Sequence, residues 1–138
     1  MLALIQRVSE ASVSVDGEVV AAIGPGLVVF VGIERDDGEQ EADTLARRVR
    51  ALRAFSDSEG RMNEALGDRE VLCVSQFTLC ADTSKGRRPG FGSAAPSEVA
   101  EPLYERFRDA LDAEGGVFGA EMSVALVNDG PVTLLVRP

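Results

Sequence analysis

The N-terminal quarter of the chain consists of short apolar runs that are typical of β-strands. Residues 2–8, 11–15 and 18–23 each fit a strand, and an Asp-Gly pair between the last two is a strong signal for a two-residue hairpin. Residues 27–33 form an unbroken β-branched and aromatic run, which predicts a strand buried on both faces. We therefore expect the chain to begin with a β-sheet.

Two later segments carry apolar residues at helical spacing. Residues 39–55 have acidic residues early and arginines late, which is the order that complements a helix dipole. Residues 97–113 follow a proline and show a second apolar stripe. We expect a polar connection over residues 56–68 with little regular structure except around residues 62–66, and strands over residues 121–127 and 132–136. The pattern as a whole predicts an α/β protein.

One strand-like stretch is interrupted by polar side chains. From Val71 to Ala81 the chain reads VLCVSQFTLCA, with Ser75, Gln76 and Thr78 inside an otherwise apolar run. A strand buried on both faces is normally apolar throughout, because an unpaired polar side chain is costly to bury. These side chains therefore either make structural hydrogen bonds on an edge strand or face a ligand.

The length of 138 residues fits one domain with a substantial core. Hydrophobic residues make up 45% and charged residues 27%, a balance typical of a globular protein. We expect no signal peptide, because Arg7 interrupts the opening apolar run, and no stretch approaches the roughly 20 apolar residues of a membrane span. Cys73 and Cys80 lie in the same stretch, on opposite faces if it is extended, so they are expected to be buried free thiols. The sequence predicts a cytoplasmic protein with no membrane partner.

The chain contains no histidine. This composition excludes a Ser-His-Asp or Cys-His couple, an imidazole general base and a histidine-based zinc site. The two cysteines and the scattered carboxylates do not form a convincing metal-binding pattern either. Any catalysis is therefore expected to work without a metal, a cofactor or a conventional base.

The net charge of −9 argues against a nucleic-acid partner at long range, although two local clusters are basic. Lys85, Arg87 and Arg88 lie in the Gly-, Ser- and Pro-rich segment 82–96, a predicted long loop that directly follows the polar stretch. The arginines of residues 47–53 form the second cluster, where helical spacing alone also explains the charges. Each cluster is either a solvated surface or a phosphate-binding face.

A second unusual stretch, Asn128 to Thr133, reads NDGPVT and lies between two predicted strands. Taken with Ser75 to Leu79, SQFTL, it makes the chain resemble the D-aminoacyl-tRNA deacylase family, whose two signature motifs read SQFTL and N-x-GPVT. The resemblance runs from the opening ALIQRV through KGRRP to the end of the chain. The link before Phe118 is shorter than is usual in the family, and both motifs are intact.

The resemblance implies a fold and an assembly. It predicts a single α/β domain over residues 1–138, with a strongly curved mixed sheet or barrel-like core, two covering helices and a homodimeric assembly. In the family the Gly-Pro peptide is cis, is donated across the dimer interface into the partner's site, and excludes an L side chain through its carbonyls. Those roles fall here on Gly130 and Pro131, held by Arg7. Taken alone, Arg7 could also be a surface residue and the Gly-Pro pair an ordinary turn.

The resemblance also implies the reaction, hydrolysis of the ester that joins a D-amino acid or glycine to the terminal adenosine of a tRNA. An activated ester needs positioning and oxyanion stabilisation more than a strong base, which suits a chain without histidine. Backbone N–H groups of Phe77 and Thr78 are expected at the oxyanion, and Gln76 at a polar group of the adenosine or ester. Ser75 is expected to be structural. Thr78 is either a nucleophile or a group that orients water or substrate, and the missing base favours the second role.

We therefore predict a cofactor-independent D-aminoacyl-tRNA deacylase of translation quality control, whose partners are D-aminoacyl-tRNA and glycyl-tRNA. Lys85, Arg87 and Arg88 would contact phosphates of the RNA end. A noncatalytic module that binds an RNA end or an aminoacyl ligand is the alternative, since no conventional base is present. A small-molecule ester hydrolase without an RNA partner is a third reading, consistent with the acidic balance.

Overall fold

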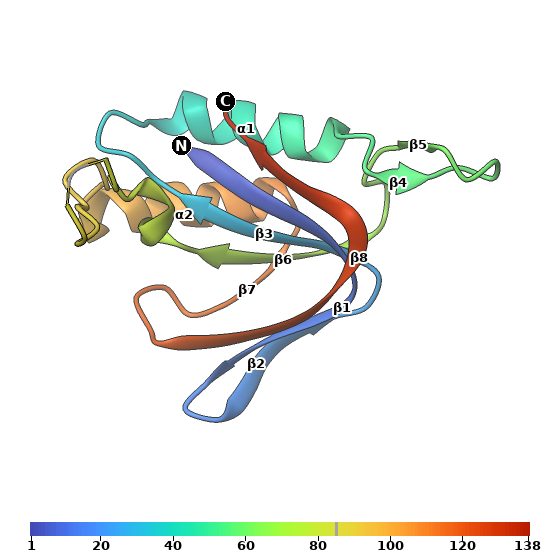
Figure 1. Ribbon diagram of the computed structural model, residues 1–138, viewed down its shortest axis with the longest axis horizontal. Coiled ribbons are helices and arrows are strands. Elements are labelled where there is room, and N and C mark those ends of the chain that lie inside the picture. Colours follow the sequence, from blue (N-terminus) through green and yellow to red (C-terminus); the bar gives the residue numbers. More distant parts are fainter. Residues whose placement is uncertain (85) are drawn as a thin grey trace.

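Two long strands, β1 (Leu2–Val15) and β8 (Met122–Val136), organise the computed structural model, which describes residues 1–84 and 86–138 (Figure 1). They are antiparallel and pair along almost their whole length. β1 is therefore one continuous strand, although its sequence predicts two. Register shifts on either side of Val8 let the strand bend where the two predicted strands meet.

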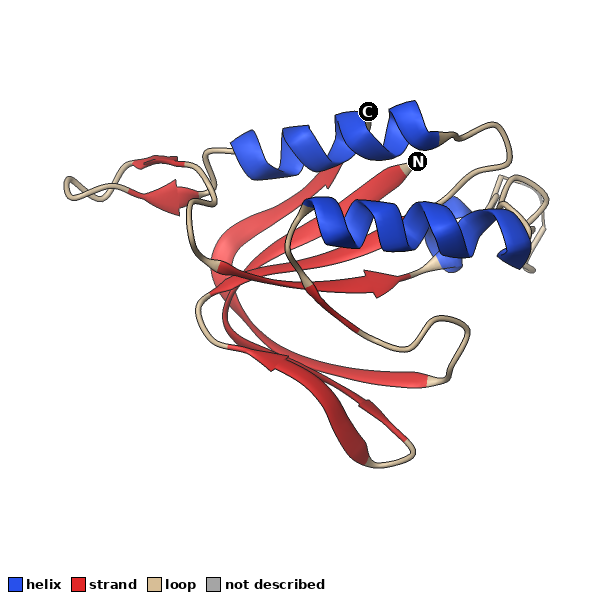
Figure 2. Ribbon diagram, turned by 180° about the vertical axis from the view of Figure 1, so that it is seen from behind, coloured by secondary structure: helices blue, strands red, loops and turns tan. Residues whose placement is uncertain are grey.

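The second edge of β1 is shared by two other strands. Its first half pairs with β3 (Gly26–Gly32) and its second half with β2 (Glu18–Ile23), both antiparallel. β6 (Glu70–Ser75) extends the sheet parallel to β3, and the short β7 (Glu114–Gly115) lies parallel to β6. Because β1 is shared in this way, the mixed sheet bends strongly and nearly closes into a barrel (Figure 2). The predicted curved, mixed sheet of a small α/β domain is confirmed.

Two helices, α1 (Glu39–Ala51) and α2 (Ser97–Ala110), lie side by side over one face of the sheet (Figure 2). Their apolar stripes are buried against the strands in one core, where Leu45 and Phe107 are fully enclosed. Both helices agree with the prediction, and both end earlier than predicted. In α1 the reason is that Leu52 adopts an extended conformation. None of the helices among the described residues is long and apolar enough to cross a membrane.

A short arm extends from the body where the sequence predicts an irregular connection. It is a hairpin of β4 (Phe55–Ser56) and β5 (Met62–Glu64), and Figure 1 shows it projecting beyond the end of α1. All of β5 is exposed, so the arm buries little apolar surface. Some regular structure was expected around residues 62–66, but the two strands are very short and only Phe55 of the pair is buried, so the pattern has too little alternation to predict a hairpin.

The SQFTL stretch is not part of a strand. β6 ends at Ser75, which pairs with Val31, and a 3-10 helix, η1 (Phe77–Cys80), follows. Gln76 still donates its backbone N–H to the Val31 carbonyl oxygen at 2.8 Å, but β3 itself ends one residue later. Because β3 ends here, it offers no partner to the residues that follow Gln76. The prediction of one strand over residues 71–81 is wrong in its second half.

The NDGPVT stretch is not a turn between separate strands. β8 runs through it, and Asn128 and Thr133 pair with the β1 residues that flank Arg7. Residues 129–132 therefore lie opposite Arg7 alone and bulge out of the ladder. Asn, Asp, Gly and Pro are typical of turns, but here the long partner strand holds both flanks in one sheet. The two strands predicted over residues 121–127 and 132–136 are therefore one strand with a bulge.

Candidate active site

A pocket of about 490 Å³ opens at the end of β3 and β6. Ser75, Gln76 and Phe77 line it at the junction of β6 and η1. The start of α2 and residues 118–124 form its other walls. The polar side chains of the lining are Ser75, Gln76 and Ser97, and the other lining residues are apolar or glycine. An apolar cavity with a few polar groups is the usual composition of a ligand site.

Thr78 and Gln76 form a hydrogen-bonded pair beside this pocket. The Gln76 amide Nε2 donates to Thr78 Oγ1 at 2.5 Å, so the Thr78 hydroxyl accepts in this bond and keeps its own proton for another partner. Thr78 is exposed and Gln76 is half-buried. Among the described residues no carboxylate, amine or thiol contacts the Thr78 hydroxyl. The geometry suits a group that positions a ligand better than an activated nucleophile.

η1 presents two backbone N–H groups at its start. The N–H groups of Phe77 and Thr78 precede the bond that Leu79 donates to the Gln76 carbonyl oxygen at 3.1 Å. In the part of the chain that the structure describes, neither group has an acceptor. Two adjacent N–H groups of this kind can stabilise a developing oxyanion.

Arg87 and Arg88 are exposed on the loop that follows η1. Reciprocal backbone hydrogen bonds between Asp82 and Gly90, at 2.7 and 2.9 Å, close this loop at its base. Neither arginine has a carboxylate partner within residues 1–84 and 86–138. Their charges are therefore open to solvent. Lys85, the third residue of the predicted basic cluster, lies outside the described residues.

Sequence reasoning missed an aromatic side chain in this loop. The ring of Phe91 meets that of Phe77 edge to face, with centroids 5.1 Å apart and planes inclined at 66°. An aromatic residue between two glycines, directly after the basic cluster, was a signal that could have identified it. Arg35 was also missed; its Nε donates to the carbonyl oxygen of Gly92 at 2.6 Å and fixes the loop beside Phe91.

The second motif is held by Arg7. The side chain of Arg7 is only 11% exposed. Its guanidinium donates to the carbonyl oxygens of Ala54 at 2.7 Å, Asp129 at 3.2 Å and Gly130 at 3.4 Å. Its Nε also pairs with the Asp129 carboxylate at 2.8 Å. These contacts tie the bulge of β8 to β1 and to the base of the β4–β5 arm, so Arg7 is not a freely solvated surface residue.

Asn128 fastens the bulge from its other flank. Its Nδ2 donates to the carbonyl oxygens of Arg7 at 2.9 Å and Val132 at 3.1 Å. The peptide between Gly130 and Pro131 is cis, and both residues are exposed. A Cβ built on Gly130 would have its nearest neighbour, the Asn128 side-chain oxygen, at 3.8 Å, an ordinary contact distance. Packing within this chain therefore does not require glycine at this position.

One chain does not bring the two motifs together. Leu27 of β3 pairs with Arg7 at the bulge, while Val31 of the same strand lies opposite Ser75 at the pocket. Four residues of strand span about 13 Å, and crossing from β8 to β6 over β1 and β3 adds roughly 14 Å. Figure 1 shows the β8 bulge and the segment after β6 at opposite ends of the sheet. A site that contains both motifs would require two chains.

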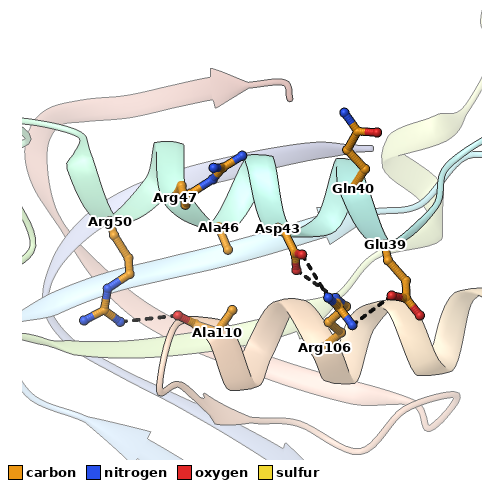
Figure 3. Close-up of a pocket in the computed structure, with 8 residues that line it drawn as sticks. All are labelled: Glu39, Gln40, Asp43, Ala46, Arg47, Arg50, Arg106 and Ala110. Atoms are coloured by element: carbon orange, nitrogen blue, oxygen red, sulfur yellow. Dashed lines mark hydrogen bonds and ion pairs between the residues drawn. The ribbon is translucent and has the colours of Figure 1, made fainter.

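A second hollow, of about 640 Å³, lies between α1 and α2, away from both motifs (Figure 3). Three of its five charged side chains are paired with one another. Arg106 binds both carboxylate oxygens of Asp43, at 2.7 and 2.9 Å, and the Glu39 carboxylate at 3.0 Å. The hydrogen bonding between Arg106 and Asp43 lowers the pKa of the Asp43 carboxyl and raises the pKa of Arg106. Since none of its lining residues is a nucleophile or aromatic, we assign the functional site to the pocket beside η1.

The two thiols are buried and free, as predicted, but they do not share a strand. Cys73 lies on β6 and Cys80 on η1, and burial raises the pKa of both thiols. Tyr104 donates its hydroxyl to the Cys73 carbonyl oxygen at 2.9 Å, and burial raises its pKa as well. Among the described residues no group of three or more His, Cys, Asp or Glu side chains is placed to hold a metal ion.

Comparison with known proteins identifies relatives over almost the whole chain. The family model described as D-Tyr-tRNA(Tyr) deacylase matches residues 4–137. A protein of Roseiflexus castenholzii named D-aminoacyl-tRNA deacylase is 56% identical, over 99% of this chain and 91% of the relative. Proteins of the same name from Vibrio cholerae and Chlorobaculum parvum are 55% and 49% identical, over 99% of this chain and 99% and 97% of the relatives.

Two solved structures have the same fold. One, described as c-Myc DNA Unwinding Element Binding Protein, has a TM-score of 0.94 and 40% identity, covering 100% of this chain and 99% of that one. The other, described as a probable eukaryotic D-amino acid tRNA deacylase, has a TM-score of 0.85 and 17% identity, covering 99% and 98%. Fold and sequence agree over nearly the full length, and this chain belongs to the D-Tyr-tRNA(Tyr) deacylase family.

Proposed function

We propose that the protein hydrolyses the ester bond of D-aminoacyl-tRNA and releases the free amino acid and the tRNA. The observation that carries this proposal is the pocket beside η1, where the Gln76–Thr78 pair and two backbone N–H groups border an otherwise apolar cavity. Relatives that are 55% and 56% identical to this chain are named for the same reaction.

In this mechanism the ester carbonyl lies near the start of η1. The N–H groups of Phe77 and Thr78 stabilise the oxyanion that forms when water attacks, and one such donor contributes about 3 kcal/mol. The Thr78 hydroxyl, oriented by Gln76, positions the water or the ester, and the neighbouring ribose 2′-hydroxyl of the substrate assists. A nucleophilic Thr78 is disfavoured because no described residue is placed to accept its proton.

Selectivity is assigned to Gly130 and Pro131 acting across a homodimer interface. Within one chain the bulge is too far from the pocket to contact a substrate there, so the motif would enter the partner's pocket. Glycine at this position has no packing role in its own chain, which is expected if the missing side chain makes room for a substrate. Backbone carbonyls that exclude an L side chain cannot exclude glycine, so glycyl-tRNA is a second substrate.

An RNA partner is supported by the charge of the loop after η1. Arg87 and Arg88 are exposed and without carboxylate partners in the described part of an otherwise acidic chain. Phosphates near the 3′ end of a tRNA are the expected ligands of these guanidinium groups. The contact positions the RNA and reads no sequence.

Single-turnover deacylation of matched D-Tyr-tRNA and L-Tyr-tRNA, with EDTA present, tests the activity. We expect rapid release of tyrosine from the D substrate alone. Equal release from both substrates would contradict the selectivity. Measurable tRNA binding without release from either would identify a noncatalytic module for RNA ends. Equal rates on D-tyrosyl-tRNA and a simple D-tyrosine ester would favour a small-molecule hydrolase.

Cross-linking tests the two-chain site. The double variant Asp129→Cys/Thr78→Cys places two accessible thiols that strand register separates by roughly 20 Å within one chain. The native thiols Cys73 and Cys80 are buried and should not compete. A bismaleimide shorter than this span should join two chains, and each single variant, as the control, should cross-link much less. A product that stays monomeric would contradict donation of the bulge to a partner.

A further inference from the structure

We propose that Phe77 and Phe91 form a stacking platform for the nucleotide that precedes the terminal adenosine of the substrate RNA. The proposal rests on the RNA-end substrate proposed above and adds a contact outside the pocket. Phe77 lines the pocket and Phe91 does not, so the pair stands at the pocket rim. A strand of RNA whose end enters the pocket on this side would meet the pair.

Both rings of the pair are unusually exposed. Phe77 is 57% and Phe91 39% exposed, whereas the core aromatic residues Tyr104 and Phe107 are 2% and 0% exposed. Leaving an aromatic ring in water forgoes the free energy of burying it. Two exposed rings in mutual contact at the mouth of a pocket therefore indicate a binding surface.

The edge-to-face arrangement leaves ring faces available. With planes inclined at 66°, the edge of one ring covers at most one face of the other. The two rings therefore do not cover each other completely, and stacking accepts any base because every base has a π-face. Unpaired bases at RNA ends are commonly recognised by stacking on aromatic side chains.

Phe91 is held in place by both of its neighbours. Gly90 exchanges two backbone hydrogen bonds with Asp82, at 2.7 and 2.9 Å. Gly92 accepts the 2.6 Å hydrogen bond from the Arg35 side chain. The backbone that carries the ring is thus held in place before any ligand arrives, which reduces the conformational entropy lost on binding.

The charges around the platform favour a nucleic acid as its occupant. Arg87 and Arg88 precede Phe91 on the same closed loop, and Arg35 lies at its base. None of the three forms an ion pair among the described residues. Cations next to exposed aromatic rings bind a ligand that combines phosphates with stacking bases, which is the arrangement found for single-stranded nucleic acid.

Aminoacylated 3′ fragments of tRNA distinguish binding at the platform from binding in the pocket. We compare the KM for D-tyrosyl-adenosine, which lacks the preceding nucleotide, with that for the D-tyrosyl trinucleotide ending in CCA. Phe91→Ala should raise the KM of the trinucleotide about tenfold relative to that of the nucleoside. Phe91→Trp, which keeps a stacking face, should retain the wild-type KM ratio. The same ratio in Phe91→Ala and the wild type would overturn the platform.

A second measurement does not depend on turnover. A CCA trinucleotide without an attached amino acid, with 2-aminopurine at its middle position, loses fluorescence when that base stacks. The chain contains no tryptophan to interfere. Wild type should quench the probe and Phe91→Ala should not. Val19→Ala, on a residue 63% exposed on β2, is the control and should quench like the wild type.

The possible failures can be told apart. Equal quenching by Phe91→Ala and the wild type would overturn the platform, whatever the activity. Phe91-dependent quenching without any D-specific hydrolysis would support the platform and overturn the proposed activity instead. A Phe91→Ala protein that sediments as a smaller species than the wild type would identify the pair as a contact between subunits, and would also overturn the platform.

Discussion

The two motifs lie at the two ends of the sheet, and they differ in how their polar groups are hydrogen-bonded. At the η1 end, the Thr78 hydroxyl has Gln76 as its hydrogen-bond partner, and the N–H groups that begin η1 have no acceptor among the described residues. At the bulge end, the side chains of Arg7 and Asn128 donate hydrogen bonds to backbone carbonyl oxygens on both sides of Gly130.

This difference indicates two tasks. Polar groups left without partners beside a pocket are available to a substrate, and they contribute most when they are aimed at charge that develops in the transition state. A backbone segment held by several hydrogen bonds is instead a rigid shape. In the proposed dimer one chain contributes the reactive half of the site, and its partner contributes the half that excludes the wrong substrate.

Replacing Arg7, whose side chain holds the bulge, should have the largest effect. Arg7→Ala leaves the carbonyl oxygens of Ala54, Asp129 and Gly130 without their donor. We expect the free energy of unfolding to fall by about 3 kcal/mol, because hydrogen bonds to a charged group are among the stronger ones. The D-over-L preference should fall at least about tenfold, since the excluding shape is no longer rigid.

Urea unfolding and single-turnover rates on both tyrosyl-tRNA enantiomers measure the two effects of Arg7→Ala. Arg61→Ala is the matched control, because the Arg61 side chain is 77% exposed and its one ion pair among the described residues is with the exposed Glu59. Selectivity that survives a large loss of stability would show that rigidity of the bulge is not needed for exclusion of L substrates.

At the η1 end, Thr78→Val removes the hydroxyl and keeps the shape of the side chain. If Thr78 positions water or substrate, the single-turnover rate should fall about 10- to 100-fold, because the backbone donors and the ribose hydroxyl remain. Loss of a true nucleophile would cost about a millionfold. Thr83→Val, on the neighbouring loop, is the control. A millionfold fall, together with an acyl-enzyme detected by mass spectrometry in the wild type, would establish the covalent route instead.

The basic loop should show an intermediate effect on binding. Arg87→Glu/Arg88→Glu should weaken tRNA binding and make the plot of log affinity against log salt shallower by about two. The matched control, Arg47→Glu/Arg48→Glu, makes the same charge change on α1. Equal losses from both double variants would show that overall charge, and not the loop, determines RNA affinity.

The smallest effect is expected in the hollow between the helices, which belongs to neither end. The hydrogen bond from Arg106 lowers the pKa of Asp43, so the ionised carboxylate stabilises the fold above the usual Asp pKa of about 3.9. This contribution is lost as the pH falls through the lowered pKa of the folded state. Asp43→Asn should therefore have a slightly lower melting temperature at neutral pH and match the wild type in strong acid. A difference that persists in strong acid would show that the charge pair is not its cause.

Hydrophobic patterning was sufficient for the elements that have a buried face. Residues 27–33 predicted a central strand, and β3 occupies Gly26–Gly32 with most of its side chains enclosed. Both helices were recognised because each buries one stripe against the sheet. The β4–β5 hairpin was not predicted as such, although some regular structure was expected around residues 62–66, because a hairpin exposed along β5 carries no such stripe.

The sequence by itself determined the class of fold, the absence of histidine chemistry and the family, since two short motifs and the composition carry that information locally. Only the tertiary structure decided what the motifs look like. The strand after Val71 stops at Ser75 because its partner β3 ends, and the bulge of β8 forms where its flanks pair with β1 residues more than a hundred positions away in the sequence. The contact of Phe91 with Phe77, and the distance between the two motifs within one chain, likewise depend on strand register. Local patterns report the burial and backbone preferences of neighbouring residues, whereas these features arise from contacts between residues that only the folded sheet brings together.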